Sequence, residues 1–148
     1  MHARGNRGFT FVELLTACSI FVVLLAIAVP SFTAFRQSTT LVSVERELMT
    51  ALYIGRSNAI MTNAQRAVVI TPPRKIEIKD GTGTTTYYTR DLNVYGSAVS
   101  IAGSSPITIT FDPRGLLTTT TSATVTITNG QSQHRTITVY PTGKPEAS

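Results

Sequence analysis

The chain has 148 residues, a single cysteine and a formal net charge of +5 at pH 7. This length has room for one domain and an N-terminal anchor, and the lone cysteine, Cys18, excludes an intramolecular disulfide. The basic excess is mild and is diluted by acidic residues between positions 36 and 91, so charge alone does not indicate nucleic-acid binding.

An apolar segment near the N-terminus follows two basic residues, Arg4 and Arg7. Positions 9–29 are apolar apart from Thr10, Glu13, Thr16 and Ser19. As a helix this stretch is about 30 Å long, which matches the hydrocarbon core of a bilayer. Because cytoplasmic flanks are enriched in Lys and Arg, we predict a membrane helix over 9–29, with its N-terminus in the cytoplasm and the rest of the chain on the far side.

Glu13 places a carboxylate inside this apolar segment. Translocon-type scales put the cost of a charged side chain at the bilayer centre at roughly 2.5–3.5 kcal/mol. An unpaired acid at this position therefore needs a partner.

The run Gly8-Phe9-Thr10-Phe11-Val12-Glu13 resembles the prepilin signature of type IV pilins and type II secretion pseudopilins. In that family a prepilin peptidase cuts after the glycine and methylates the new N-terminal amine. The resemblance implies a leader peptide at 1–8, cleavage between Gly8 and Phe9, and an N-methylated Phe9. It also implies that Glu13 pairs with the ammonium of Phe9 on a neighbouring subunit, so that filament assembly removes the cost of both unpaired charges.

An ordinary secretory signal peptide is the alternative, since Ala26-Ile27-Ala28 has the form of an A-x-A cleavage site. Glu13 at the head of the apolar run argues against this alternative. So does the length of the run, which exceeds the roughly 7–15 apolar residues usual in such signals.

A helical pattern continues past Pro30, where the loss of a backbone hydrogen bond predicts a kink. Apolar or small residues at spacings of three and four then form one stripe: Leu41, Val44, Leu48, Ala51, Leu52, Gly55 and Ala59. Polar residues fall on the opposite side: Arg46, Thr50 and Ser57. We predict one long helix from Phe9 to about Met61, in which 30–62 is an amphipathic continuation that packs on a sheet.

After Asn63 the pattern changes to that of β-strands. The predicted strand runs are 67–71, 75–79, 87–88, 107–111, 124–128 and 136–139. Turn residues separate them at Asp80–Gly83 and at Asn129-Gly130, and Thr118–Thr121 is predicted to be a solvated loop. In the later runs threonines alternate with apolar residues, as expected of antiparallel strands with one solvated face. A long helix that covers an antiparallel sheet over 63–148 is an α+β fold.

Further segments are similar to the FimT/GspH branch of minor pilins and pseudopilins: Pro30-Ser31-Phe32, Glu47-Leu48, Gly55-Arg56-Ser57, 109–115 and 135–139. The resemblance covers nearly the whole chain and implies a pilin-like fold. The partners it implies are the prepilin peptidase, other pilins or pseudopilins, an inner-membrane assembly platform and membrane lipid. It also implies a single-pass protein of the bacterial inner membrane, with 63–148 as a periplasmic β domain.

The C-terminal tail departs from the pattern of FimT-type proteins that are linked to DNA uptake. Those proteins typically carry a Gly-Arg-x-Arg type motif after the last strand, whereas the matching stretch here is Gly143-Lys144-Pro145-Glu146. Lys binds phosphate as a point charge and lacks the bidentate fork of Arg, and Glu146 can pair with it. Arg135 and Lys144 are the candidate DNA contacts.

No residue pattern indicates an enzyme, a metal site or a cofactor. His2 would leave with the leader, His134 stands alone, and Asp80–Gly83 lacks the lysine and following helix of a phosphate-binding loop. We therefore predict a minor pilin that acts in pilus assembly or priming. Two alternatives stay open: a type II secretion pseudopilin in the export of folded proteins, and a DNA-binding minor pilin in natural transformation.

Overall fold

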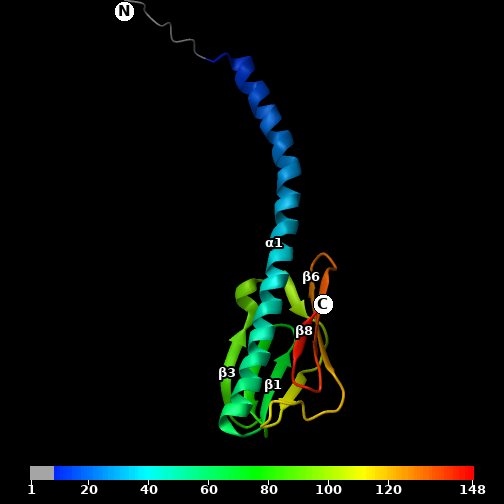
Figure 1. The fold of residues 1–148 in the computed structure, drawn as a ribbon. Coiled ribbons are helices and arrows are strands. Elements are labelled where there is room, and N and C mark those ends of the chain that lie inside the picture. The colour runs from blue at the N-terminus through cyan, green and yellow to red at the C-terminus, as the bar shows by residue number, and fades with distance from the viewer. Residues whose placement is uncertain (1–8) are drawn as a thin grey trace, which may run out of the picture. The chain divides into compact units, whose positions relative to one another are not determined.

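The computed structural model describes residues 9–148, so Gly8 and the rest of the predicted leader lie outside the described residues. The chain forms two compact units, and the boundary between them follows Phe35. The first unit contains the N-terminal part of helix α1 (Phe11–Thr62). The second, Arg36–Ser148, contains the rest of α1 and the strands (Figure 1). The helix assignment is continuous through Pro30, and the kink at that residue stays a prediction.

Helix α1 ends where its backbone turns into the left-handed region. Asn63 has a φ of +48°, and its N–H donates to the carbonyl of Ile60 at 3.3 Å. The N–H of Ala64 donates to the carbonyl of Ala59 at 3.2 Å. This pair of bonds is a Schellman motif, which satisfies carbonyls at the end of the helix, and Asn is one of the few residues that adopts its left-handed position readily.

The strands form two antiparallel sheets of four strands each. The first sheet has the order β3-β2-β1-β5, with β1 (Arg66–Thr71), β2 (Lys75–Asp80), β3 (Thr86–Asp91) and β5 (Ile107–Phe111). The second has the order β4-β6-β7-β8, with β4 (Val99–Ile101), β6 (Ala123–Asn129), β7 (His134–Val139) and β8 (Pro145–Ala147). A short 3₁₀ helix, η1 (Leu92–Tyr95), follows β3.

The α+β prediction is confirmed, but the structure has two sheets where one was predicted. The chain passes from the first sheet to the second at β4, returns to the first at β5, and enters the second again at β6. Between β5 and β6 lie an isolated bridge from Phe111 to Leu117 and the exposed threonine loop 118–121. The two strands that the pattern missed, β4 and β8, have three residues each. Such short strands contain too few alternations to be recognised.

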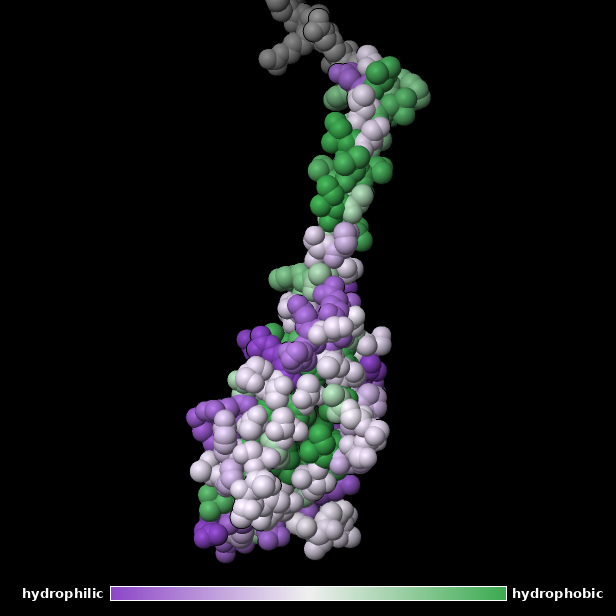
Figure 2. Space-filling model, turned by 90° about the vertical axis from the view of Figure 1, so that its right-hand side faces the viewer, coloured by the Kyte–Doolittle hydropathy of each residue, from purple (hydrophilic) through white to green (hydrophobic). Residues whose placement is uncertain are grey.

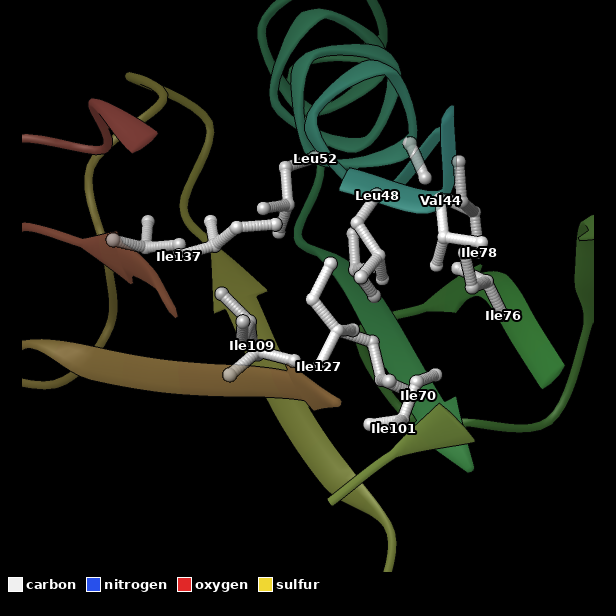
Figure 3. Packing of buried hydrophobic residues seen from close by; sticks show 14 of the residues in the cluster. Val44, Leu48, Leu52, Ile70, Ile76, Ile78, Ile101, Ile109, Ile127 and Ile137 are labelled. Carbon is white, nitrogen blue, oxygen red and sulfur yellow. The ribbon is translucent and has the colours of Figure 1, made fainter. Parts of the chain in front are cut away.

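One hydrophobic core lies between α1 and both sheets. Val44, Leu48 and Leu52 point from the helix toward isoleucines of the two sheets (Figure 3). The whole predicted stripe of α1 is buried, and Arg46, Thr50 and Ser57 are exposed on the other side of the helix, as predicted. Gly55 belongs to the stripe because a Cβ at this position would overlap the side chain of Val68 on β1. Helix and strand therefore approach more closely here than any larger residue would allow.

The last hairpin, β6–β7, is present as predicted from Asn129-Gly130, but its loop is longer than a two-residue turn. The side-chain oxygen of Asn129 accepts hydrogen bonds from the backbone N–H groups of Gln131 and Gln133, both at 3.0 Å. The left-handed position is taken by Ser132, with a φ of +61°. The Asn side chain thus organises a four-residue loop from within the hairpin.

Candidate functional site

Thr10 and Glu13 cap the N-terminus of α1 together. Glu13 Oε2 accepts hydrogen bonds from the backbone N–H of Thr10 at 3.0 Å and from its hydroxyl at 3.1 Å. In return, the N–H of Glu13 donates to Thr10 Oγ1 at 3.2 Å. This is the reciprocal geometry of a capping box, with Thr10 at the N-cap and Glu13 three residues on. The spacing Thr-x-x-Glu is present in the sequence, but only the pairing of Glu13 with Phe9 of a neighbouring subunit was predicted, and the cap was not.

The rest of the N-terminal helical segment is apolar and exposed. Within residues 9–35, Glu13 is the only charged side chain. Large apolar side chains are exposed along the segment, from 76% for Phe11 to 46% for Leu25. The hydroxyl of Thr16 donates to the carbonyl of Val12 at 3.0 Å, and that of Ser19 donates to the carbonyl of Leu15 at 2.8 Å. These hydroxyls are satisfied within the helix, as an apolar environment requires. By length and composition, α1 could cross a membrane.

The two candidate DNA contacts lie toward opposite ends of β7, and each forms an ion pair with an acidic side chain. Arg135 Nη1 lies 3.1 Å from Glu45 Oε2 of α1. Lys144, in the turn after β7, donates from Nζ to Glu146 Oε1 at 2.6 Å. Lys144 lies next to Tyr140, whose backbone N–H donates to the Lys144 carbonyl at 3.0 Å. Arg135 and Tyr140 are separated by five strand steps, about 17 Å, so the structure does not bring the two cations together. The Glu146 carboxylate raises the pKa of Lys144, and Lys144 lowers the pKa of Glu146.

Arg56 joins the end of α1 to two turns that are distant in the sequence. Its Nε donates to the carbonyl of Gly115 at 3.0 Å, and its Nη2 donates to the carbonyl of Thr142 at 3.3 Å. Gly115 and Gly143 have φ values of +78° and +75°. A Cβ on Gly143 would overlap the carbonyl oxygen of Gly115. This contact between the segments around Arg56 and Gly115 was not predicted from the sequence.

Among residues 9–148 there is no group of three His, Cys, Asp or Glu side chains that could hold a metal ion. His134 is exposed at the start of β7, and Cys18 is exposed on the N-terminal helical segment.

The apolar N-terminal helix, its capped acid and the helix-on-sheet unit are those of a pilin-like protein. Residues 3–29 match the prokaryotic N-terminal methylation motif, and residues 46–143 match the family described as type II transport protein GspH. The chain belongs to this GspH family, and is a minor pilin or pseudopilin of the type IV pilin class. The predicted family resemblance is confirmed at this level, while the FimT assignment stays a prediction.

Two crystal structures of the type IV minor pilin FimU from Pseudomonas aeruginosa (strain PAO1) are similar in fold. The alignment with the P21 form has a TM-score of 0.64 at 18% sequence identity, and it covers 77% of this chain and 92% of the FimU chain. The alignment with the P65 form has a TM-score of 0.59 at 18% sequence identity, and it covers 73% of this chain and 92% of the FimU chain. At this sequence identity, the similarity to FimU shows a shared fold and nothing about function. No curated protein matches the chain.

Proposed function

We propose that this chain is a minor pilin that is incorporated into a type IV pilus-type filament and acts in pilus assembly or priming. In this proposal 1–8 is a cytoplasmic leader and 9–29 anchors the protein in the bacterial inner membrane. Residues 30–62 continue the helix and 63–148 lie in the periplasm. Family membership, the methylation motif and a helix apolar and long enough to cross a membrane support this proposal.

Processing by a prepilin peptidase between Gly8 and Phe9 would create a methylated ammonium on Phe9. Phe9 is 91% exposed and immediately precedes the N-cap residue Thr10. A positive charge at a helix N-terminus is opposed by the helix dipole. A carboxylate supplied by another subunit would therefore stabilise the new ammonium.

The observation that carries the proposal is the arrangement around Glu13. Both hydrogen bonds from Thr10 go to Oε2, and within residues 9–148 no hydrogen bond to Oε1 is present. Thr10 thus partly satisfies the carboxylate in a lone subunit. The ammonium of Phe9 on a neighbouring subunit can pair with Oε1 without breaking the cap, and this pairing neutralises two charges within an apolar helix bundle.

The test is the recovery of variants in sheared filaments. Glu13→Ala is expected to insert into the membrane normally but to co-purify with filaments at least about tenfold less well, since each 1.4 kcal/mol of lost pairing is tenfold. Ser19→Ala is the matched control, because among the described residues this hydroxyl bonds only to the carbonyl of Leu15 in its own helix. Recovery of the Glu13 variant at the control level would contradict the proposal.

Replacing Gly8 by a bulky residue should leave a precursor whose mass retains residues 1–8.

A type II secretion pseudopilin is the second candidate, and the description of the matching family favours it. The same residues would serve the same purpose in a secretion filament. A deletion strain separates the two candidates: loss of extracellular enzymes with normal pili supports the pseudopilin, and loss of pili with normal secretion supports the minor pilin.

A DNA-binding minor pilin is the third candidate and has less support, because Arg135 and Lys144 are each paired with an acid. It predicts that the purified protein shifts duplex DNA at low salt, with a slope of log K against log salt near −0.9 for each phosphate contact. No shift at low salt would eliminate it.

A further inference from the structure

The outer face of the second sheet carries hydroxyl side chains and very little charge. Strand alternation turns Val125 and Ile127 into the core. The opposite face, called here the hydroxyl face, consists of residues from β4, β6 and β7: Ser100, Thr124, Thr126, Thr128, Thr136 and Thr138. Each is exposed or half-buried. Strand register sets Thr126 opposite Thr136.

The outer face of the first sheet differs, because charged residues line it. Lys75 and Lys79 on β2 lie 3.0 and 3.5 Å from the carboxylate of Glu77. Thr108 of β5 belongs to this charged face, since it lies opposite Val69, which in turn lies opposite Glu77. The contrast between the two sheets shows that a solvated sheet face of this protein can carry charges, and that the hydroxyl face lacks them.

The hydroxyl face is bordered by other residues at its ends. Glu146 of β8 lies opposite Thr138, and Lys144 neutralises its charge. His134 lies opposite Thr128 at the other end. Figure 1 places β6 and β8 on one side of the unit, and Figure 2 turns that side toward the viewer. Its surface is mostly near-white, of intermediate hydropathy, with a green apolar patch near the middle and purple hydrophilic residues mostly toward the margins (Figure 2).

The chemistry of this face narrows the kind of partner. It offers no unpaired cation for a phosphate group, and no aromatic ring among its six residues on which a base or a sugar could stack. Threonine side chains are stiff at χ1, so little conformational entropy is lost when they are covered. Charge-depleted surface is typical of the centre of a protein–protein interface. An uncharged protein surface is therefore the complementary partner.

The partner would approach the face of this sheet, since its edges are poorly suited to strand addition. β8 is a three-residue edge strand that begins with Pro145, which has no N–H to donate, and it carries Glu146. β4, at the other edge, also has three residues. Short edge strands that contain proline or charge discourage pairing with another chain.

We propose that the hydroxyl face is the contact by which the globular unit packs against an uncharged surface of the neighbouring subunit in the filament. This inference rests on the proposed function, which supplies the neighbour. At about 4.8 Å between strands and about 6.7 Å between same-face residues, the hydroxyl face covers roughly 200 Å². A standard interface buries about 800 Å² per partner. The hydroxyl face is thus the centre of the contact, and Tyr140, His134 and the Lys144–Glu146 pair form its rim.

The first test is photo-crosslinking in cells that assemble filaments, with p-benzoylphenylalanine in place of Thr126. The matched control carries the same group in place of Thr108 on the charged face. We expect an adduct from position 126 whose partner, identified by mass spectrometry, is a pilin-type subunit with an N-terminal methylation motif. The proposal is overturned by no adduct, by a partner of another kind, or by an equal yield of the same adduct from position 108.

The second test separates this inference from the proposed function. Thr126→Val keeps the shape and neutrality of the face and should enter filaments normally. Thr126→Lys should be processed and inserted into the membrane normally but recovered in sheared filaments at least tenfold less, whereas Thr108→Lys should be recovered like the unmodified chain. Equal recovery of Thr126→Lys and Thr108→Lys overturns the contact and leaves the proposed function standing. Absence of the unmodified chain from filaments overturns both.

Discussion

Glu45 and Glu47 lie two residues apart on α1 and form ion pairs with different sheets. Glu45 Oε2 is 3.1 Å from Arg135 Nη1 of β7, and Glu47 Oε1 is 2.7 Å from Arg90 Nε of β3. Residues two apart on an α-helix point about 200° away from each other. The helix is therefore held on both flanks, once to each sheet, over the core that its apolar stripe forms.

Glu47 is expected to contribute more to stability than Glu45. Besides Arg90, it accepts hydrogen bonds from the hydroxyls of Tyr88 and Tyr95, both at 3.5 Å. Glu47→Gln should therefore lower the melting temperature of the full chain in detergent more than Glu45→Gln does. Thermal denaturation followed by circular dichroism measures both. Equal shifts would show that the two tyrosines add nothing to the ion pair with Arg90.

The helix and most strands were predictable because their patterns are local. The stripe from Leu41 to Ala59 needs only the period of one helix, and each threonine-faced strand needs only its own alternation. The division into two sheets and the ion pairs of Glu45 and Glu47 depend on which distant segments meet. A single sequence does not contain that information in any local pattern.

Gly143 should be intolerant of a side chain. A residue other than Gly at its φ of +75° costs about 1–3 kcal/mol, and the overlap of a Cβ with the carbonyl oxygen of Gly115 adds to this. Gly83 is the matched control, because its φ is +79° and nothing lies within 4 Å of its Cβ position. Gly143→Ala should therefore lower the free energy of unfolding clearly more than Gly83→Ala in chemical denaturation. Equal losses would mean that the contact between the Gly143 and Gly115 turns relaxes freely.

Acid should destabilise the globular unit through its carboxylates. The backbone N–H of Leu116 donates to Asp112 at 2.9 Å and, with Arg114, holds the pKa of Asp112 below its ordinary value of 3.8. The N–H of Asn93 lowers the pKa of Asp91 in the same way. Because the pKa is lower in the folded chain, this stabilisation is complete above the unfolded-state pKa and is lost as the pH falls through the folded-state pKa.

Melting temperatures should therefore change little between about pH 7 and pH 5 and fall below about pH 4. Asp112→Asn should melt at a lower temperature at neutral pH and show a shallower decline in acid, since the variant has no charge to lose at this position. A variant with the unmodified acid slope would show that Asp112 does not contribute to it.

The candidate site was predictable in part. Glu13 was legible as a charge in an apolar segment, and the Thr10-x-x-Glu13 spacing would also have indicated the cap. The ion pair that neutralises Arg135 could not be predicted from the sequence, because its partner Glu45 lies on a different element. The contact of Arg56 with the turns at Gly115 and Thr142 was hidden for the same reason.

The hydroxyl of Thr10 should stabilise the first turn of α1. It takes part in two of the three capping bonds with Glu13, at 3.1 and 3.2 Å. Thr10→Val keeps the branched shape but removes this hydroxyl, at a cost of about 1 kcal/mol for a lost N-cap, whereas Thr10→Ser keeps it. Amide hydrogen exchange in residues 11–14 of the detergent-solubilised chain should become about fivefold faster in Thr10→Val and stay unchanged in Thr10→Ser. Filament recovery should fall less than in Glu13→Ala, because the carboxylate of Glu13 remains available to a neighbouring Phe9. Indistinguishable exchange in the Val and Ser variants would mean that the cap does not hold the start of the helix.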